Sequence, residues 1–378
     1  MARLAAVVEA RILEREEQLE PLREQWDELA VRLGMPYAAP AWMLAWWHHA
    51  APAGAAMRVV TVGDGERLLG IAPLFANGGE GRSAHYQLLS SRLAPPAPVL
   101  VDPEHAAEAI PALAGAIGRA RPKPALLRIE GSREMHALTT EQLVAAWPGI
   151  RPEAQRTEVV PMPMVRIEGR SYEEWLGEKR SKFRHEAKRR RRKLEEAGGS
   201  FRLATLDDAE EAIDAFMRLH GARWQLRGGS TALVPGVREM LAEAAAAMLP
   251  SGRLRVHLLE LEGKTIAVQI IVAAGPEAIG WSGGFDEATK SLAPAVQLTL
   301  EAIAEAAKHG NARFNLGPGG QAYKERLADE RDEMAVVKLV PRGAAYPRTK
   351  LRMASEQARA DLLPRLRAKL RRGGRDEQ

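Results

Sequence analysis

The sequence predicts an α/β (α+β) fold of two tandem domains, each with a mixed central sheet flanked by helices. The chain has 378 residues, which suits two domains of roughly 100 to 200 residues, and a hydrophobic share of 46% can give each domain a core. Residues 255–269 align with residues 58–72 at a constant offset of 197 positions, without a gap. The elements around these two segments also follow the same order, which favours an internal repeat.

The elements of the first half follow from hydrophobic periodicity and turn residues. In order, we expect a strand at 7–13, helices at 21–33 and 41–50, a hairpin with strands at 57–62 and 68–75, a helix at 110–120 and a strand at 126–129. Gly34 ends the first of these helices, and Gly63-Asp64-Gly65 is a turn signal between the two hairpin strands.

The second half repeats this order. We expect a strand at 201–206, helices at 207–224 and 235–249, the hairpin at 255–269, a strand at 278–283, a helix at 294–309 and a strand at 312–316. Turn chemistry restricts hairpin sequences, so the hairpin match alone fits chance as well as duplication. The shared order of the flanking elements favours duplication.

Between the repeats, residues 148–163 form a proline-bearing connector, and a basic segment follows it. Residues 178–196 hold ten Lys/Arg against four Glu, and residues 364–378 hold six Lys/Arg against two acids, in a chain of net charge +5. The apolar residues of the first segment, which are Leu176, Phe183, Ala187 and Leu194, fall near one face of a single helix that stops at Gly198-Gly199. We therefore divide the chain into an N-terminal domain (1–147), a linker with a basic helix (148–200), a C-terminal domain (201–341) and a basic helical tail (342–378).

Several classes of chemistry are excluded. The absence of cysteine excludes a disulfide scaffold, an iron–sulfur cluster, a thiolate zinc site and a cysteine nucleophile. No metal site is expected, because the nine histidines are scattered and His48-His49 lacks the i, i+4 spacing of metal ligands. There is no Walker loop. No uncharged apolar run reaches the roughly 18 residues needed to span a bilayer, and the first residues lack a signal core, so we expect a cytoplasmic protein.

Four groups of residues carry a family resemblance. They are WDELA from Trp26 with PAWMLAWW from Pro40, KRSKFRHEAKRRRRKLEEAGG from Lys179, LHGARW from Leu219, and GWSGGFD from Gly280 with FNLGPGGQAYKERL from Phe314. Their order resembles the GNAT acyltransferase fold. A tandem pair is similar to the CelD-type acetyltransferases of cellulose and exopolysaccharide biosynthesis, which are relatives of the Fem-type aminoacyltransferases. The resemblance spans residues 7–341 and implies a degenerate first domain and a catalytic second one.

The resemblance implies acetyl-CoA as the acyl donor, held where the strands at 278–283 and 312–316 part. The residues expected to bind it are Trp281, Ser282, Gly283, Pro294, Ala295 and Asn315. Two features depart from the family pattern. The loop that would meet the CoA diphosphate, residues 290–295, has no glycine, and Ala295 stands where the family has one; Asn315 stands where Asp is common. A Fem-type enzyme, which takes its acyl group from charged tRNA, would not need that loop.

The resemblance and the residue chemistry together suggest two catalytic groups. Tyr323 follows the flexible Gly317-Pro318-Gly319-Gly320 run and is expected to act as a general acid near the departing sulfur, or else to pack at the rim. His220 ends a predicted helix and is the best-placed base, because imidazole titrates near neutral pH; a histidine bonded within the fold is the alternative. Lys324, Arg223 and Trp224 are expected to meet a phosphate, a carboxylate or a sugar of the acceptor, or else to be structural.

The two basic segments have several interpretations. The helix near Lys179 is a solvated face, a clamp for the diphosphate of a sugar-linked acceptor through Arg180, Lys182 and Arg184, or a nucleic-acid surface. In the tail, Leu351, Ala354, Ala358, Leu362, Leu366 and Leu370 form an apolar stripe under many arginines. We expect this helix to pack on its own domain, with peripheral contact at an anionic membrane as the alternative.

The predicted function is acetyl transfer from acetyl-CoA to an amine or hydroxyl of a saccharide-related or other cell-envelope precursor. Two alternatives stay open: aminoacyl transfer from tRNA, and a non-catalytic module that binds phosphorylated glycans.

Overall fold

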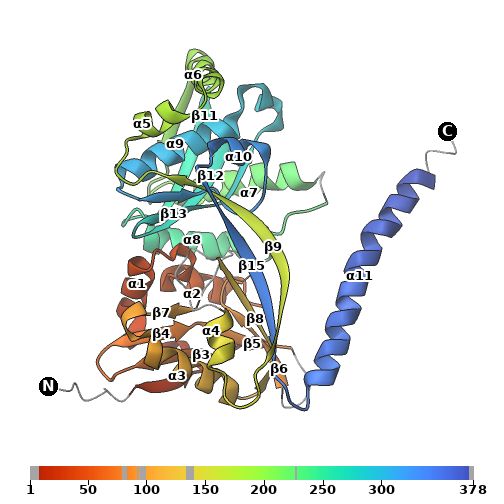
Figure 1. Cartoon of the computed structure of the whole chain (residues 1–378). Helices are drawn as coiled ribbons and strands as arrows, with labels where there is room; N and C mark the ends of the chain where they lie inside the picture. Colours follow the sequence, from red (N-terminus) through yellow and green to blue (C-terminus); the bar gives the residue numbers. More distant parts are fainter. Residues whose placement is uncertain are drawn as a thin grey trace.

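A computed structural model describes residues 8–78, 83–91, 93, 99–132, 140–225 and 228–373. On the last helix it describes the side chains as far as Arg359, together with Leu362. Two stacked bodies are joined by long strands, and one helix extends away from them (Figure 1).

The first half contains the elements expected from the sequence with several short additions, whereas the segment after it contains a long strand and two helices. In order, the elements are β1 (Glu9–Leu13), α1 (Arg23–Arg32), α2 (Pro40–His49), β2 (Ala56–Met57), β3 (Val59–Gly63), β4 (Leu68–Ala72), β5 (Leu74–Asn77), β6 (Ser83–Leu88), β7 (Leu100–Val101), α3 (Ala106–Arg119), β8 (Lys123–Ser132), α4 (Thr140–Ala145), β9 (Glu153–Arg166), α5 (Tyr172–Glu178) and α6 (Ser181–Glu196). Short 3-10 turns lie at Glu16–Gln18, Glu20–Leu22, Pro36–Ala38 and Pro103–His105.

The second half follows the same plan. Its elements are β10 (Gly199–Leu203), α7 (Ala209–Gln225), α8 (Val237–Met248), β11 (Leu254–Leu261), β12 (Lys264–Ala274), β13 (Glu277–Phe285), the 3-10 turn η5 (Glu287–Leu292), α9 (Pro294–Lys308), β14 (Arg313–Asn315), α10 (Ala322–Leu327), β15 (Glu330–Val340) and α11 (Tyr346–Gly373).

The repeat is present in three dimensions. In each half an outer strand pairs antiparallel with the first hairpin strand, β1 with β3 and β10 with β11. Each half also has one parallel pair, β6 with β8 and β13 with β14. The halves differ at Pro73, which separates β4 from β5, whereas Ile270 at the same offset lies inside the continuous β12. Proline has no backbone N–H to give to a ladder, and here β4 and β5 belong to different sheets.

The last strands of the two halves are exchanged. The larger sheet has the order β10-β11-β12-β13-β14-β9-β15-β8-β6-β5-β2, so β9 pairs with β14 of the second half and β15 pairs with β8 of the first (Figure 1). The expected connector at 148–163 is therefore wrong for most of its length, because β9 begins at Glu153. Pro161 and Pro163 pair with β15 on one side, while on the other side their carbonyls accept from the N–H groups of Gly319 and Leu316. A residue's N–H points to the same side of a strand as its carbonyl, so the missing proline N–H groups do not interrupt the ladder with β15.

Close backbone contacts hold the two halves together. At Gly236, where φ is +77°, an added Cβ would lie 1.7 Å from the carbonyl oxygen of His49. At Gly275, where φ is +50°, it would lie 2.2 Å from that of Val31. Both sites require glycine, for space as well as for conformation. The main hydrophobic core also contains buried residues from both halves, so the first half is positioned to shape a site in the second.

The basic segment is two helices instead of the single one that was expected. α5 ends at Glu178, and the extended backbone of Lys179 and Arg180, with ψ of 156° and 136°, starts α6 in a new direction. Leu176 is buried on α5, while Ala187 and Leu194 are buried on α6. The apolar face is therefore shared by two helices packed at a corner.

The tail helix α11 does not pack on its own domain, which corrects the expectation. Only its beginning is anchored, where Thr349 and Met353 are buried, and the rest extends from the body (Figure 1). The described residues of the expected apolar stripe are all exposed, namely Leu351, Ala354, Ala358 and Leu362. The side chains of Leu366 and Leu370 lie outside the described part of the chain.

Candidate active site

The parallel strands β13 and β14 separate in the middle of the second half. They pair from Glu277 with Arg313 as far as Ile279 with Asn315. After this point Leu316 and Gly319 donate backbone hydrogen bonds to β9, so the chain follows β9 and leaves the edge of β13. β13 continues to Phe285 and pairs only with β12. The backbone of Gly317 still lies against Gly280, where an added Cβ would come within 2.6 Å of the carbonyl oxygen, so the result is a wedge that opens beyond Gly280.

A bulge re-aims β13 at the mouth of this wedge. Ile270 of β12 lies opposite Ser282 and Ile271 lies opposite Gly280, so Trp281 is an extra residue on β13. A bulge of this kind bends its strand and turns a side chain. The Trp281 Nε1 donates to the carbonyl of Leu93 in the first half at 2.9 Å. The first half therefore fixes the strand that borders the wedge.

A cavity of about 380 Å³ fills the opening. Tyr37 and Leu93 of the first half contribute to its wall. The residues predicted from sequence that line it are His220, Arg223, Trp224, Trp281, Ser282, Gly283, Ala295, Tyr323 and Lys324. Sequence reasoning missed several polar residues of the same wall, namely Ser230, Gln269, Thr299 and Gln321.

His220 is held between β13 and the loop after α7. Its Nδ1 lies 2.9 Å from the Gly283 carbonyl and its Nε2 lies 2.7 Å from the Ser230 hydroxyl. Because a carbonyl only accepts, Nδ1 carries the proton, and Nε2 accepts from Ser230. Burial lowers the pKa of His220, against the bond to Gly283, so the neutral form is favoured. The ring is therefore a base whose free electron pair faces a serine hydroxyl.

The position of His220 follows from tight packing of α7 on β13. An added Cβ at Gly284 would lie 2.4 Å from the His220 backbone nitrogen. The ring also stacks on Trp224, with centroids 5.9 Å apart and planes at 28°. On the far side, the Ser230 hydroxyl oxygen accepts from the Ala232 N–H at 3.0 Å, which orients its own proton toward His220.

Lys324 is a buried cation at the wedge. Its Nζ donates to the carbonyls of Gly317 at 3.1 Å and Pro318 at 3.0 Å, and its residue is only 7% exposed. Burial lowers the pKa of Lys324 to about 8. An ammonium has three protons, so one remains to be offered to the cavity. Burial also raises the pKa of the neighbouring Tyr323, which keeps its phenol protonated at neutral pH.

Arg223 and Trp224 form the outer wall. The Arg223 guanidinium lies over the Phe285 ring at 4.4 Å and its Nε lies 3.4 Å from a Glu287 carboxylate oxygen. Trp224 is 36% exposed, more than most large apolar side chains of the described chain. Both side chains line the cavity on the side where Trp224 is exposed to solvent.

Five predicted residues do not line the cavity. Asn315 is buried beneath it, where its Oδ1 accepts from the Gly317 N–H at 2.9 Å, and Pro294 is buried at the start of α9. Arg184 donates to the carbonyls of Gly177 and Lys179 at 2.6 and 2.7 Å, which fixes the α5–α6 corner. The remaining two are Arg180 and Lys182, which are exposed.

The start of α9 bears on the acyl donor. Pro294 has no N–H, and the N–H groups of Val296 and Gln297 both donate to the carbonyl of Ala293. Of the first three residues of α9, Pro294 therefore has no N–H to offer a diphosphate and Val296 has its N–H already bonded. Leu292 and Ala295 also pack in one cluster with Leu194 of α6. The cradle for a CoA diphosphate is not preformed here.

Among the described residues, no group of three or more His, Cys, Asp or Glu side chains is arranged to hold a metal ion. Within the same part of the chain, no helix combines the length and the apolar character that crossing a membrane requires.

Comparison with known proteins agrees with this geometry. Residues 181–325, from the start of α6 to Glu325 in α10, match the family model described as Acetyltransferase (GNAT) domain. No curated protein matches the sequence. A crystal structure of FemX is similar over 83% of this chain and 95% of that one, with a TM-score of 0.59 and 14% identity.

Two further solved structures are also similar in fold. One is the C-terminal domain of a putative lysylphosphatidylglycerol synthetase from Agrobacterium fabrum, with 12% identity, 89% and 96% coverage and a TM-score of 0.53. The other is L-PGS from Bacillus licheniformis, with 12% identity, 89% and 97% coverage and a TM-score of 0.51. At these identities the likeness concerns the fold alone.

The wedge, the family match and the repeat define the class. The chain has the fold of two tandem GNAT-like units, and residues 181–325 match the model of a GNAT acetyltransferase domain. The narrower resemblance to CelD-type enzymes stays a prediction.

Proposed function

We propose that the second half transfers an acyl group, acetyl from acetyl-CoA in the first instance, to an amine or hydroxyl of a saccharide-related or other cell-envelope precursor. The observation that carries the proposal is the wedge between β13 and β14. It places a cavity beside a buried cation, a protonated phenol and a neutral histidine–serine pair, at Lys324, Tyr323 and His220. An acyl transfer needs such groups: a base for the nucleophile, charge stabilisation at the carbonyl oxygen, and an acid for the leaving group.

The base acts through a serine. Because the Nε2 of His220 already accepts from Ser230, an acceptor in the cavity meets the serine hydroxyl first. As the acceptor nitrogen or oxygen attacks the acyl carbon, its proton passes to the Ser230 oxygen and the serine proton passes to His220. Ser230 ends the step as a hydroxyl, and His220 becomes an imidazolium whose two N–H groups face Gly283 and Ser230.

The other two groups act on the donor. Lys324, held by two carbonyls, offers its remaining proton to the carbonyl oxygen as negative charge develops there. Tyr323 gives its phenolic proton to the thiolate that departs. The carbon–sulfur bond breaks as the new carbon–nitrogen or carbon–oxygen bond forms, and the tyrosinate is reprotonated from solvent.

A second candidate is aminoacyl transfer from charged tRNA, and the start of α9 favours it. An aminoacyl ester would place its carbonyl group in the same wedge. It carries no CoA diphosphate, so it would not need free amides at the start of α9, where the Val296 N–H is already bonded. The polyanionic tRNA would instead lie on basic surface outside the cavity.

Calorimetry with the full chain separates the donors. Acetyl-CoA, CoA, a sugar nucleotide and a stable aminoacyl minihelix RNA are titrated into the protein and into S282L, which places a larger side chain in the cavity. S200L, at an exposed position on β10, is the matched control. Saturable acetyl-CoA binding that S282L abolishes supports the first proposal, and RNA binding alone supports the second. If sugar nucleotides bind and neither donor does, the chain is a binding module.

A further inference from the structure

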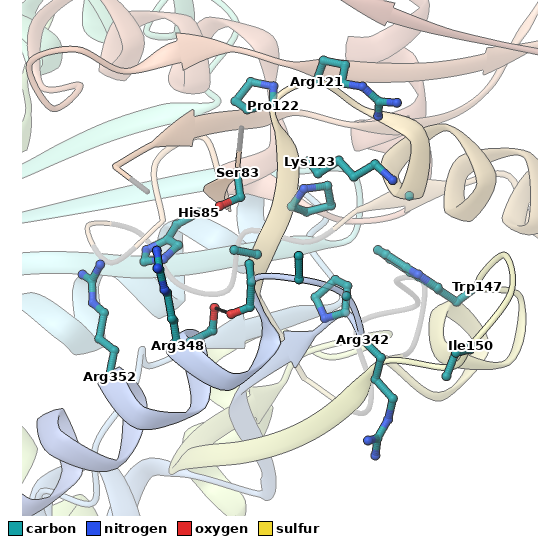
Figure 2. A pocket seen from close by; sticks show the side chains of 18 of the residues that line it. Ser83, His85, Arg121, Pro122, Lys123, Trp147, Ile150, Arg342, Arg348 and Arg352 are labelled. Atoms are coloured by element: carbon teal, nitrogen blue, oxygen red, sulfur yellow. Dashed lines mark hydrogen bonds between the residues drawn. The ribbon is translucent and has the colours of Figure 1, made fainter. Parts of the chain in front are cut away.

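A second, larger hollow lies far from the wedge in the sheet order, at the base of α11. Its volume is about 1620 Å³. Its walls come from the start of β6, the start of β8, the turn after α4, the segment between β15 and α11 and the first turns of α11, and Figure 2 shows how these segments surround it. We call it the α11 groove.

The α11 groove is lined by cations. Those in its wall are Arg121, Lys123, Arg342, Arg348 and Arg352, and none of its lining residues is Asp or Glu. Figure 2 shows Arg348 and Arg352 directed toward the same side as His85. Burial, together with the charge of Arg352, lowers the pKa of His85, as expected in an electropositive hollow.

Several of these cations are held in place. Arg352 pairs with Glu356 one turn along α11 at 2.9 Å, and Arg342 lies 5.1 Å from the Tyr346 ring centre. The Nη1 of Arg121 donates to the carbonyls of Arg119 and Ala120 at 2.8 and 3.1 Å. The groove thus presents a fixed arrangement of positive charge, which fits the phosphates of a large anionic surface.

Large aliphatic side chains are exposed beside the cations. Ile150 on one wall is 70% exposed and Leu351 on the α11 wall is 75% exposed. Leu362, farther along α11, is 53% exposed. Few large apolar side chains in the described chain are this exposed, and two of these three lie on α11. A nucleic-acid backbone gives such side chains no partner, whereas the acyl region of a bilayer does.

The spacing along α11 puts the two kinds of side chain on adjacent strips. Leu351, Ala354, Ala358 and Leu362 follow one another at intervals of three or four residues, and so lie along one face. Arg348, Arg352 and Arg359 lie along the neighbouring face, since they are separated by four and seven residues. Both strips are exposed, because α11 leaves the body after its first turns. An apolar strip bordered by arginines is the pattern of a helix that lies on an anionic membrane.

We propose that the α11 groove and the exposed face of α11 together bind the surface of an anionic phospholipid membrane. The arginines meet lipid phosphates, while Ile150 and Leu351 enter the acyl boundary. The inference does not depend on the acyl-transfer proposal, since it uses no residue of the wedge. It would hold a transferase at the place where lipid-linked envelope precursors are found.

The test is sedimentation of the full chain with vesicles of equal parts phosphatidylglycerol and phosphatidylcholine, against vesicles of phosphatidylcholine alone. We expect binding to the anionic vesicles only. R348Q/R352Q should weaken it roughly tenfold or more. I150Q/L351Q should weaken it as well and make the residual binding more sensitive to salt. The matched control K188Q/R189Q, which removes two exposed cations from α6, should bind as the wild type does.

The substituted side chains are exposed, so we expect each variant to keep its fold. Thermal unfolding of each variant checks this. Absence of binding to anionic vesicles overturns the proposal, as does equal loss in the α6 control. A single-stranded RNA oligonucleotide is the competing probe. If the RNA binds, and if R348Q/R352Q weakens that binding while I150Q/L351Q leaves it unchanged, the surface is a nucleic-acid site and the membrane inference is wrong.

Discussion

Replacing Lys324 with Met tests whether the buried charge of Lys324 at the wedge lowers the free energy of unfolding. Burial lowers the pKa of Lys324 from 10.5 to about 8. At pH 7 the side chain is charged in the folded and unfolded states alike, and the fold bears the cost of that buried charge, about 3 kcal/mol. Between pH 8 and 10.5 the folded protein releases this proton before the unfolded chain does, so stability rises and the cost falls to about 1 kcal/mol at pH 10.

The variant also loses the hydrogen bonds to Gly317 and Pro318, which contribute about 1 kcal/mol each. K324M should therefore be about 1 kcal/mol more stable than the wild type at pH 7 and about 1 kcal/mol less stable at pH 10. Its turnover should fall at least about a hundredfold, because the charge at the carbonyl oxygen is lost.

Urea unfolding of both proteins at pH 7 and pH 10 measures this change of sign. K188M, at an exposed position on α6, is the matched control and should differ from the wild type by the same small amount at both pH values. A difference between K324M and the wild type that does not change with pH would show that Lys324 is not a buried cation. Unchanged turnover in K324M would remove it from the reaction.

Three further predictions concern the remaining site residues. Y323F should lower turnover by about a hundredfold or more while leaving donor affinity unchanged, as measured by steady-state kinetics and calorimetry; equal turnover would remove Tyr323 from the mechanism. S230A should lower turnover and S230T should restore much of it. Because burial lowers the pKa of His220, the loss of wild-type turnover at low pH should have its midpoint below pH 6.5; a midpoint above pH 6.5 would contradict this. R184E should lose about 1 to 3 kcal/mol of stability in urea unfolding, because two carbonyls lose their donor. R180E should lose no stability and should weaken only the binding of a phosphorylated acceptor. Unchanged acceptor affinity in R180E would mean that the basic helix is a solvated face.

Local patterns were enough to predict most of the elements. The hairpin at 255–269 and its counterpart at 58–72 both form at the predicted offset, because turn glycines and alternating apolar residues act over short range. The corner between α5 and α6 was missed, since it depends on the backbone of Lys179 and Arg180. Pro161 and Pro163 led to the wrong prediction of a connector for a different reason. Whether a strand tolerates proline depends on which neighbouring strand the missing N–H would have faced, and the sequence does not show this.

The exchange of β9 and β15 could not be predicted, because strand pairing between segments about 170 residues apart leaves no local trace. The same holds for α11, whose apolar residues fit either a core or an external surface until its surroundings are known.

The candidate site was predicted where a residue type and a motif coincided. Tyr323, Lys324 and His220 follow from the quoted motifs and meet in one cavity. Ser230 was missed because it lies in a loop with no motif, ten residues after His220, and only the fold brings their side chains within 2.7 Å. Arg184 was assigned to a ligand on its charge, whereas its guanidinium satisfies carbonyls at a helix corner.

The most direct test of the account is a crystal structure of the full chain grown with acetyl-CoA and, separately, with a stable aminoacyl minihelix RNA. The account predicts the carbonyl of one of these donors between β13 and β14, within hydrogen-bond distance of the Lys324 ammonium. A donor carbonyl bound elsewhere, with the wedge empty under saturating conditions, would contradict it.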